Sequence, residues 1–405
     1  MSHKSLHGVT TLTRYDVIVA GAGPAGSTAA RECACRGLSV LLLDRAAFPR
    51  DKPCGGGVNV RAARLLPFDL DPVIERTATG VRFSVKLSGS FDRSYPTSLT
   101  HMTQRSRLDT FLVERAVEAG AVLRERSAVR DVERQNDHVV VRAGAEVFEG
   151  RTLVAADGAN GPTARLAGIS VDGRMGIALE ANVTDGGAAG AWRSMIGLDL
   201  GSTPGGYGWL FPRADHVNIG VGGWLHAAPT LRARLDRVAR FYGLDHAVMW
   251  NVRGHHLPVR RPGSPLVSGN LLLVGDAAGL LDPLTGEGIH AAIWSGQAAA
   301  RHLAAFLSAQ IPDLQPYARE VEGTLGADLA IASWLHRVID RFPGVFVALV
   351  ERQATAWQLV CEILRGDETY AGYVRRFSWF VAARRYVRSS LGMISRPATT
   401  SHSPR

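Results

Sequence analysis

Three glycines near the N-terminus, Gly21, Gly23 and Gly26, have the G-x-G-x-x-G spacing of loops that bind a dinucleotide diphosphate. Gly21 permits a tight turn, Gly23 lets the backbone approach a pyrophosphate, and Gly26 lets a helix pack closely on a strand. The diphosphate would lie at a helix N-terminus, where free N–H groups and the helix dipole favour negative charge. Asp44, 18 positions after Gly26, could accept hydrogen bonds from ribose hydroxyl groups.

The segments around these glycines predict a complete β-α-β unit. Residues 15–20 (YDVIVA) form an apolar run with β-branched residues, which is typical of a buried parallel strand. An Ala-rich helical stretch continues to Arg36, and residues 39–44 (SVLLLD) form a second strand. Because the glycines lie between a strand and a helix, a dinucleotide site is favoured over an ordinary glycine-rich turn.

Two further buried strands lead into acidic residues. Residues 152–156 (TLVAA) precede Asp157, and residues 270–274 (NLLLV) precede Gly275 and Asp276. An Ala-rich helix is predicted from about residue 287 to 307, and its N-terminus would favour negative charge. Asp157 could bind a ligand or cap a turn, and the sequence favours neither.

The remaining segments predict a second sheet and a helical tail. Residues 81–87 (VRFSVKL) alternate like a half-buried strand, and a helix is expected to begin at Arg105. Residues 170–260 contain short strand-like runs separated by glycine, which is typical of an antiparallel sheet. Short strands are also expected at 121–133 and 138–149, and a helical region at 316–390.

The composition argues against several classes of protein. The chain has 405 residues and a formal net charge of +9, but only three of its 46 basic residues are lysine. No run of five basic residues occurs, so we expect no nucleic-acid partner. The four cysteines form no C-x-x-C pair and predict neither a disulfide framework nor a metal site. The histidines show no ligand spacing and are expected on the surface or in packing, including His101, His255, His256 and His290.

The cellular location is predicted from two sequence features, the N-terminal segment and the longest apolar runs. The first residues show no apolar signal sequence, and no apolar run approaches the roughly 20 residues of a membrane span. These features predict a cytoplasmic protein. Aromatic and basic residues alternate near the C-terminus, and such a mixture could rest on an anionic membrane surface or simply cap the fold. The basic residues of this segment are Arg375, Arg376, Arg384, Arg385 and Arg388.

Three motifs together, GAGPAG, ADGANG and GDAAGLLDPLTGEGI, resemble the FAD fingerprints of the aromatic-hydroxylase-like flavoprotein superfamily, in that family's order. The resemblance implies tightly bound FAD, with Arg105 near the diphosphate and ribityl chain and Asp276 near the ribityl chain. The FAD-binding residues that it implies are Gly21, Gly23, Ala25, Gly26, Asp44, Arg45, Cys54, Gly55, Gly56, Arg105, Asp157, Gly275, Asp276, Gly286, Gly288 and Ile289.

Two further motifs narrow the resemblance to the geranylgeranyl reductases, which saturate double bonds in prenyl chains. Residues 50–57 (RDKPCGGG) resemble their K-x-C-G-G-G loop, and residues 207–212 (YGWLFP) resemble their Y-x-W-x-F-P motif. The implied reaction is hydride transfer from reduced flavin N5 to one alkene carbon, with a proton delivered to the other. Cys54, Tyr207 and Trp209 are the implied catalytic residues. The implied substrate-binding residues are Tyr207, Trp209, Phe211 and Pro283.

The fold expected from this resemblance is α/β. A Rossmann-like FAD-binding domain of the aromatic-hydroxylase type carries an inserted antiparallel-sheet substrate domain and a C-terminal helical region. The expected boundaries are 1–70, 101–168 and 263–315 for the FAD-binding domain, 71–100 and 169–262 for the substrate domain, 316–390 for the helical region, and 391–405 for a disordered tail.

Other activities of the same superfamily remain as alternatives. Halogenases carry W-x-W-x-I-P and a relay lysine; this chain has Tyr207 and Phe211 at the differing positions, although Lys52 or Lys86 could serve as the lysine. An aromatic monooxygenase would share the same FAD core. A flavoprotein that passes electrons to quinone usually adds an iron–sulfur module, whose clustered cysteines are missing here. The electron donor of a reductase would be external, NAD(P)H or ferredoxin, because no second dinucleotide fingerprint occurs.

Overall fold

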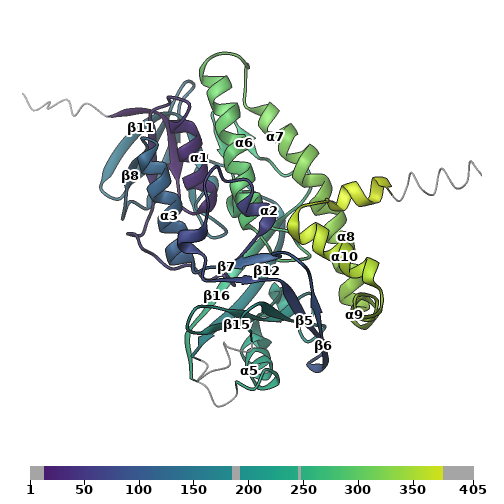
Figure 1. Cartoon of the computed structure of the whole chain (residues 1–405). Helices are drawn as coiled ribbons and strands as arrows, with labels where there is room; N and C mark the ends of the chain where they lie inside the picture. Colours follow the sequence, from purple (N-terminus) through teal and green to yellow (C-terminus); the bar gives the residue numbers. More distant parts are fainter. Residues whose placement is uncertain (1–12, 185–191, 245–247, 377–405) are drawn as a thin grey trace, which may run out of the picture.

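An eight-stranded, mostly parallel sheet forms the upper left part of the molecule in Figure 1. The computed structural model describes residues 13–184, 192–244 and 248–376. The strands are β1 (Arg14–Ala20), β2 (Val40–Leu43), β8 (Val122–Arg124), β9 (Val129–Arg134), β10 (Val139–Ala143), β11 (Glu146–Ala155), β17 (Val267–Ser268) and β18 (Leu271–Leu273). The main path is β17-β18-β11-β1-β2-β8, with β10 and β9 added beside β11. Parallel pairing of β1 with both β2 and β11 brings three loop-bearing strand ends to one edge.

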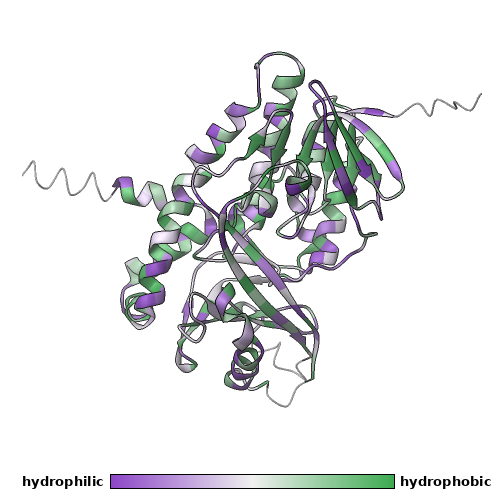
Figure 2. Cartoon of the chain, turned by 180° about the vertical axis from the view of Figure 1, so that it is seen from behind, coloured by the Kyte–Doolittle hydropathy of each residue, from purple (hydrophilic) through white to green (hydrophobic). Residues whose placement is uncertain are grey.

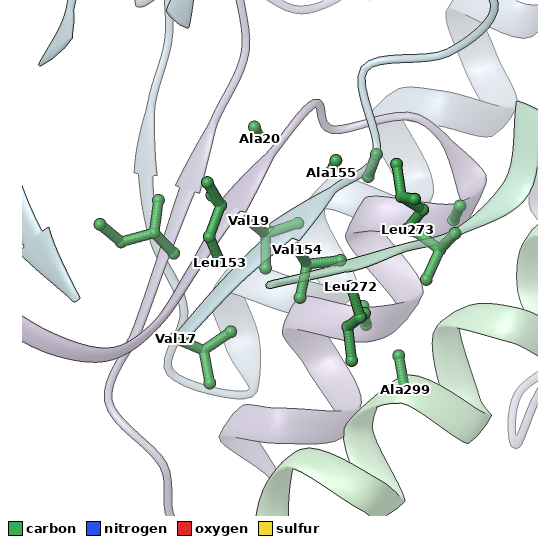
Figure 3. Packing of buried hydrophobic residues seen from close by; sticks show 14 of the residues in the cluster. Val17, Val19, Ala20, Leu153, Val154, Ala155, Leu272, Leu273 and Ala299 are labelled. Carbon is green, nitrogen blue, oxygen red and sulfur yellow. The ribbon is translucent and has the colours of Figure 1, made fainter. Parts of the chain in front are cut away.

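Helices cover this sheet and bury it completely at its centre. They are α1 (Pro24–Ala34), α3 (Arg105–Glu118) and α6 (Ile289–Leu307). Val17, Val154 and Leu272, from three adjacent strands, are fully buried in one apolar cluster (Figure 3). Helices α1 and α6 pack closely because residue 296 is glycine: a Cβ there would lie 2.6 Å from the Ala25 carbonyl oxygen.

A second sheet of seven strands lies below the first in Figure 1. Its strands are β5 (Gly80–Val85), β6 (Ser88–Ser94), β12 (Gly173–Val183), β13 (Met195–Leu200), β14 (Tyr207–Pro212), β15 (Val217–Trp224) and β16 (Met249–Arg260). Their order is β16-β12-β15-β14-β13-β5-β6, antiparallel throughout except for the parallel pair β5–β13. Alternate residues of β15, such as Ile219, pack against α5 (Leu231–Phe241) on one face. The opposite face is turned towards the first sheet.

A helical layer follows the first sheet in the chain. It comprises α7 (Gln315–Val321), the π-helical turn η5 (Glu322–Gly326), α8 (Ala327–Arg341), α9 (Pro343–Arg352) and α10 (Ala354–Arg365). Val347 and Trp357 bury one face of this layer against Phe83 and Ile196 of the second sheet. The smaller elements are β3 (Gly57–Asn59), β4 (Arg76–Ala78), β7 (Thr100–Met102), α2 (Val60–Ala63), α4 (Thr163–Leu166), η1 (Asp71–Val73), η3 (Leu225–Thr230) and η4 (Gly275–Ala278).

The expected α/β fold class is confirmed, and some element boundaries differ. The short strands expected at 138–149 form a hairpin that turns at Gly144, whose φ of +59° suits glycine. Its second strand, β11, runs unbroken to Ala155 and so includes most of the buried strand expected at 152–156. The helix predicted from Glu287 begins at Ile289, because the Glu287 carboxylate accepts the His290 N–H at the helix start. The domain boundaries stay a prediction, and residues 377–405, with Arg384, Arg385 and Arg388, lie outside the described residues.

Candidate active site

The glycine loop between β1 and α1 has the geometry that the motif predicts. Gly21 has a φ of +103°, and a Cβ on Gly26 would lie 1.8 Å from the Gly21 carbonyl oxygen. A side chain at Gly26 would therefore separate the helix from the strand. Gly23 precedes Pro24, the first residue of α1, and no described side chain caps the helix amides there. The loop thus presents an open helix N-terminus to a ligand.

Two arginines face this helix N-terminus across Gly23. A Cβ on Gly23 would lie 3.6 Å from Arg50 Nη2 and 3.8 Å from Arg105 Nη2. Both guanidinium groups bind the single, fully buried carboxylate of Asp109, Arg50 at 2.8 Å and Arg105 through two 2.7 Å hydrogen bonds. Burial alone would lower the pKa of Arg105, but the Asp109 carboxylate raises it above its ordinary value. Arg50 Nη2 also lies 3.7 Å from Asp44 Oδ2. Two permanent cations that face a positive helix end suit the diphosphate of a dinucleotide.

Asp44 and Asp157 hold the neighbouring loops. Asp44 Oδ2 accepts the Ala22 N–H at 2.8 Å, which ties the end of β2 to the glycine loop. Arg45, next in the chain, is exposed. Asp157 Oδ2 accepts hydrogen bonds from the Thr163 backbone and hydroxyl, whereas its Oδ1 is buried and lacks a partner among the described residues. Burial raises the pKa of Asp157. Its bonds to Thr163 cap a turn, and its second oxygen can accept a hydrogen bond from a ligand.

The third motif lies beside the Cys54 loop. Lys52 Nζ binds Asp276 Oδ2 at 3.0 Å, and Asp276 Oδ1 is near Gly288, where a Cβ would lie 3.1 Å from it. Burial would raise the pKa of Asp276, but the Lys52 charge overcomes this effect and lowers it. Gly275 has a φ of +55° and packs against Ala25 of α1. Further along this motif, Pro283 and Ile289 are buried and Gly286 has a φ of +69°.

The Cys54 loop is held against β12 by a buried glutamate. Glu180 is 8% exposed, and its Oε1 accepts the Cys54 N–H at 2.9 Å. The Cys54 Sγ accepts the Gly56 N–H at 3.3 Å, and Arg213 donates to the Gly55 carbonyl. No described residue forms an ion pair with Glu180. Burial raises the pKa of Glu180 to about 7, against the opposing effects of the Cys54 hydrogen bond and the Arg213 charge.

An aromatic row on β14 continues from this loop. Tyr207, Trp209 and Phe211 lie on one face of the strand, with ring centroids 6.0 and 6.1 Å apart. The Tyr207 hydroxyl donates to the Thr285 carbonyl, and Phe211 contacts the Cys54 loop at Gly55, where a Cβ would lie 2.7 Å from its ring. The row therefore connects the third motif to the cysteine loop.

Sheet register places Glu180 in line with this row. Gly220 of β15 pairs with Glu180 of β12 on one side and with Trp209 of β14 on the other. A Cβ on Gly220 would lie 2.0 Å from Trp209 Cζ2, so the indole ring extends over this glycine towards Glu180. Trp209 Nε1 is fixed by Asn218 Oδ1 at 2.8 Å. An acid and an aromatic surface therefore share one face of the sheet.

The sequence did not identify Glu180, Arg50 or Arg213 as site residues. Glu180 alone carried a signal, because an acidic residue in the mostly apolar run ALEANV is unusual for a half-buried strand. His255 was expected in packing or on the surface. Burial lowers the pKa of His255 to about 4, and the positive charge of Lys52 adds to this effect. The His255 ring is therefore close enough to Lys52 to feel its charge.

The fold and the site agree with comparisons to known proteins. A family model for an FAD binding domain matches residues 14–189. The menaquinone reductase of Mycolicibacterium smegmatis is 32% identical, over 71% of this chain and 76% of the relative. The geranylgeranyl diphosphate reductase of Rhodobacter capsulatus is 32% identical, over 74% and 77%. Digeranylgeranylglycerophospholipid reductase 1 of Methanothermobacter thermautotrophicus is 31% identical, over 74% and 79%.

The chain belongs to the geranylgeranyl reductase family of FAD-dependent oxidoreductases. A solved geranylgeranyl bacteriochlorophyll reductase-like protein from Thermoplasma acidophilum is 25% identical with a TM-score of 0.75, covering 90% of this chain and 98% of its own. A flavin-dependent brominase matches with a TM-score of 0.71 at 22% identity, which shows the shared fold alone.

FAD is therefore the cofactor of this reductase-family protein, and the residues fit it. The crowded glycines, the open N-terminus of α1 and the Arg50–Arg105 pair suit the diphosphate, and the unpartnered Asp157 oxygen could accept one hydrogen bond. The flavoprotein resemblance found in the sequence is confirmed. The contacts of each named residue with FAD stay predictions.

Proposed function

We propose that this enzyme reduces carbon–carbon double bonds of a prenyl chain. The observation that carries the proposal is the buried Glu180 carboxyl group, bonded to the Cys54 loop and aligned with the aromatic row of Tyr207, Trp209 and Phe211. An acid beside an apolar aromatic surface suits protonation of an alkene. The names of the relatives, which act on menaquinone, geranylgeranyl diphosphate and digeranylgeranyl lipid, support the same substrate class.

The reaction adds a hydride to one alkene carbon and a proton to the other. Bound FAD, once reduced by an external NAD(P)H or ferredoxin, supplies the hydride. An isolated alkene has no carbonyl group to accept negative charge, so the proton must be transferred at the same time as the hydride. Glu180 is the proton source in this proposal, because its carboxyl group is buried and its pKa of about 7 keeps much of it protonated at neutral pH.

The aromatic row binds the chain and stabilises charge. Partial positive charge on the alkene would lie near the π faces of Trp209 and Tyr207, an arrangement worth about 0.5–2 kcal/mol. Phe211 joins the apolar cluster that α9 and α10 share with β5 and β13, which offers the chain an apolar path away from the loop. In this proposal the Cys54 side chain positions the reacting bond, and its loop is held by the hydrogen bond from the Cys54 N–H to Glu180.

The decisive experiment is reduction of defined prenyl substrates under anaerobic conditions. The FAD-loaded protein, reduced with dithionite, is mixed with geranylgeranyl diphosphate, menaquinone or a digeranylgeranyl lipid, and the products are measured by mass spectrometry. We expect one of these substrates to gain two hydrogens per reduced double bond while the flavin is reoxidised. A parallel aerobic reaction with added chloride is the comparison. Products that form only with oxygen or chloride would overturn the proposal in favour of a monooxygenase or a halogenase.

Replacing Cys54 separates a direct role from packing. Cys54→Ala and Cys54→Ser should keep FAD bound but lower the reduction rate about tenfold or more, because the loop next to the reacting bond loses its sulfur contact with Gly56. Single-turnover flavin reoxidation measures the rate. Cys35→Ala is the matched control, since Cys35 is exposed at the end of α1. A wild-type rate in both Cys54 variants would assign this residue to packing.

A further inference from the structure

Five large apolar side chains form an exposed stripe along α8 and α9. Their exposed fractions are 56% for Trp334, 40% for Val338, 53% for Phe342, 61% for Val345 and 50% for Leu349. Trp334 and Val338 are four residues apart on α8, and Val345 and Leu349 are four apart on α9, so each pair shares one side of its helix. Phe342 lies between the helices, and its backbone bonds to Val338 and Val345 link the two pairs. We call these five residues the outer stripe. Isolated exposed apolar residues are ordinary, but five large ones within 16 consecutive residues mark an interaction surface.

The inner side of the same helices is already packed. Val347 and Val350 of α9 are 6% and 1% exposed and lie in the apolar cluster with the second sheet. The Asp340 carboxylate accepts the Gly205 N–H at 2.8 Å, and the His336 ring packs against Trp224 at 5.3 Å, which fixes α8. Hydrophobic and hydrophilic segments alternate along these helices in Figure 2. The outer stripe is therefore an additional apolar face on a firmly anchored layer.

The charges around the outer stripe are mostly positive. Arg337, Arg341 and Arg352 are exposed beside it, and within the described ranges none of them forms an ion pair. The Arg341 guanidinium lies over the Phe342 ring, 5.3 Å from its centroid. The exposed acids nearby are Asp340, which accepts the Gly205 N–H, and Glu351, so the three arginines outnumber the two acids. Arginines flanking Trp, Phe and aliphatic side chains match the headgroup and acyl boundary of an anionic bilayer.

We propose that the outer stripe of α8 and α9 docks on an anionic phospholipid surface. Among the described residues no helix is long and apolar enough to span a membrane, so the contact is with the bilayer surface. The stripe side chains enter the acyl boundary, and the three arginines pair with lipid phosphates. The inner side of this layer packs in the cluster that also contains Phe211. When the outer stripe is docked, only the thickness of this helical layer separates Phe211, at one end of the aromatic row, from the lipid.

The proposal is tested by sedimentation of the FAD-loaded chain with vesicles. We expect binding to phosphatidylcholine vesicles that contain phosphatidylglycerol, and little binding to phosphatidylcholine alone or at high salt. The double variant Val345→Asp, Leu349→Asp should lower binding about tenfold or more, because two exposed side chains no longer insert. The matched control is Val117→Asp, an exposed valine on α3 with 44% exposure, which should bind as the wild type does.

Several outcomes would overturn the proposal. Unchanged binding of the double variant would assign any membrane contact to another part of the chain, such as the basic C-terminal residues. Absence of wild-type binding to the anionic vesicles would reject the membrane, and a wild-type dimer that the double variant dissociates would assign the stripe to a second copy. Retained FAD and unchanged reduction of a detergent-dispersed substrate verify that the variant is folded, and these readouts are independent of vesicle binding.

Discussion

Glu180→Gln should lower the rate of alkene reduction by about 10²- to 10⁴-fold while FAD stays bound, the range expected when a general acid is removed. Glutamine keeps a carbonyl oxygen to accept the Cys54 N–H, so the loop stays in place and only the transferable proton is lost. The measurement is anaerobic single-turnover reoxidation of the reduced enzyme by whichever of the three prenyl substrates it reduces. KM should change little, because the effect lies in the chemical step.

The pH profile distinguishes proton delivery from a structural role. Because burial raises the pKa of Glu180 to about 7, the protonated acid predominates below that pH and is depleted above it. The wild-type rate should therefore fall as the pH rises through about 7, and the glutamine variant should lose this dependence. Glu118→Gln, on the exposed end of α3, is the control and should leave both rate and profile unchanged. A variant at Glu180 with the wild-type profile would show that the proton comes from another group.

Gly26→Ala should abolish retention of FAD during purification. The new Cβ would lie 1.8 Å from the Gly21 carbonyl oxygen and 3.0 Å from the Ala156 side chain, and no rotamer change can relieve contact with a backbone atom. Helix α1 must then move away from the glycine loop, which displaces the amides and arginines that we expect to bind the diphosphate. Overpacking of this kind also costs about 1–3 kcal/mol in the free energy of unfolding. The ratio of flavin to protein absorbance and urea unfolding of the FAD-free protein measure the two effects.

The matched control for this substitution is Gly323→Ala. No described atom lies within 4 Å of a Cβ at Gly323, in the π-helical turn η5. FAD content should stay at the wild-type level, and stability should be unchanged or slightly higher because alanine favours helix over glycine. Normal FAD content in Gly26→Ala would contradict the assignment of this loop to the diphosphate.

Local features of the chain were predictable because they depend on backbone conformation over short distances. The apolar runs of β1, β2 and β18 and the spacing of Gly21, Gly23 and Gly26 predicted the parallel sheet and its loop correctly. The turn between Ala143 and Glu146 was harder to predict from the sequence, because a single residue, Gly144, decides whether the strand continues or turns. The start of α6, expected at about residue 287, lies at Ile289, where the Glu287 side chain accepts the His290 N–H.

The sequence by itself determined the cofactor class and the strands that carry its loops, because each motif is contained in one short segment. Only the tertiary structure decided how the proposed catalytic groups meet. Glu180 and Cys54 are 126 positions apart, and their contact depends on the register of β12 with β15. A shift of one residue would turn Glu180 towards α5, where Ala181 now packs. Register is set by the packing of whole sheets and not by any local pattern, which is why the buried acid was visible only in the folded chain.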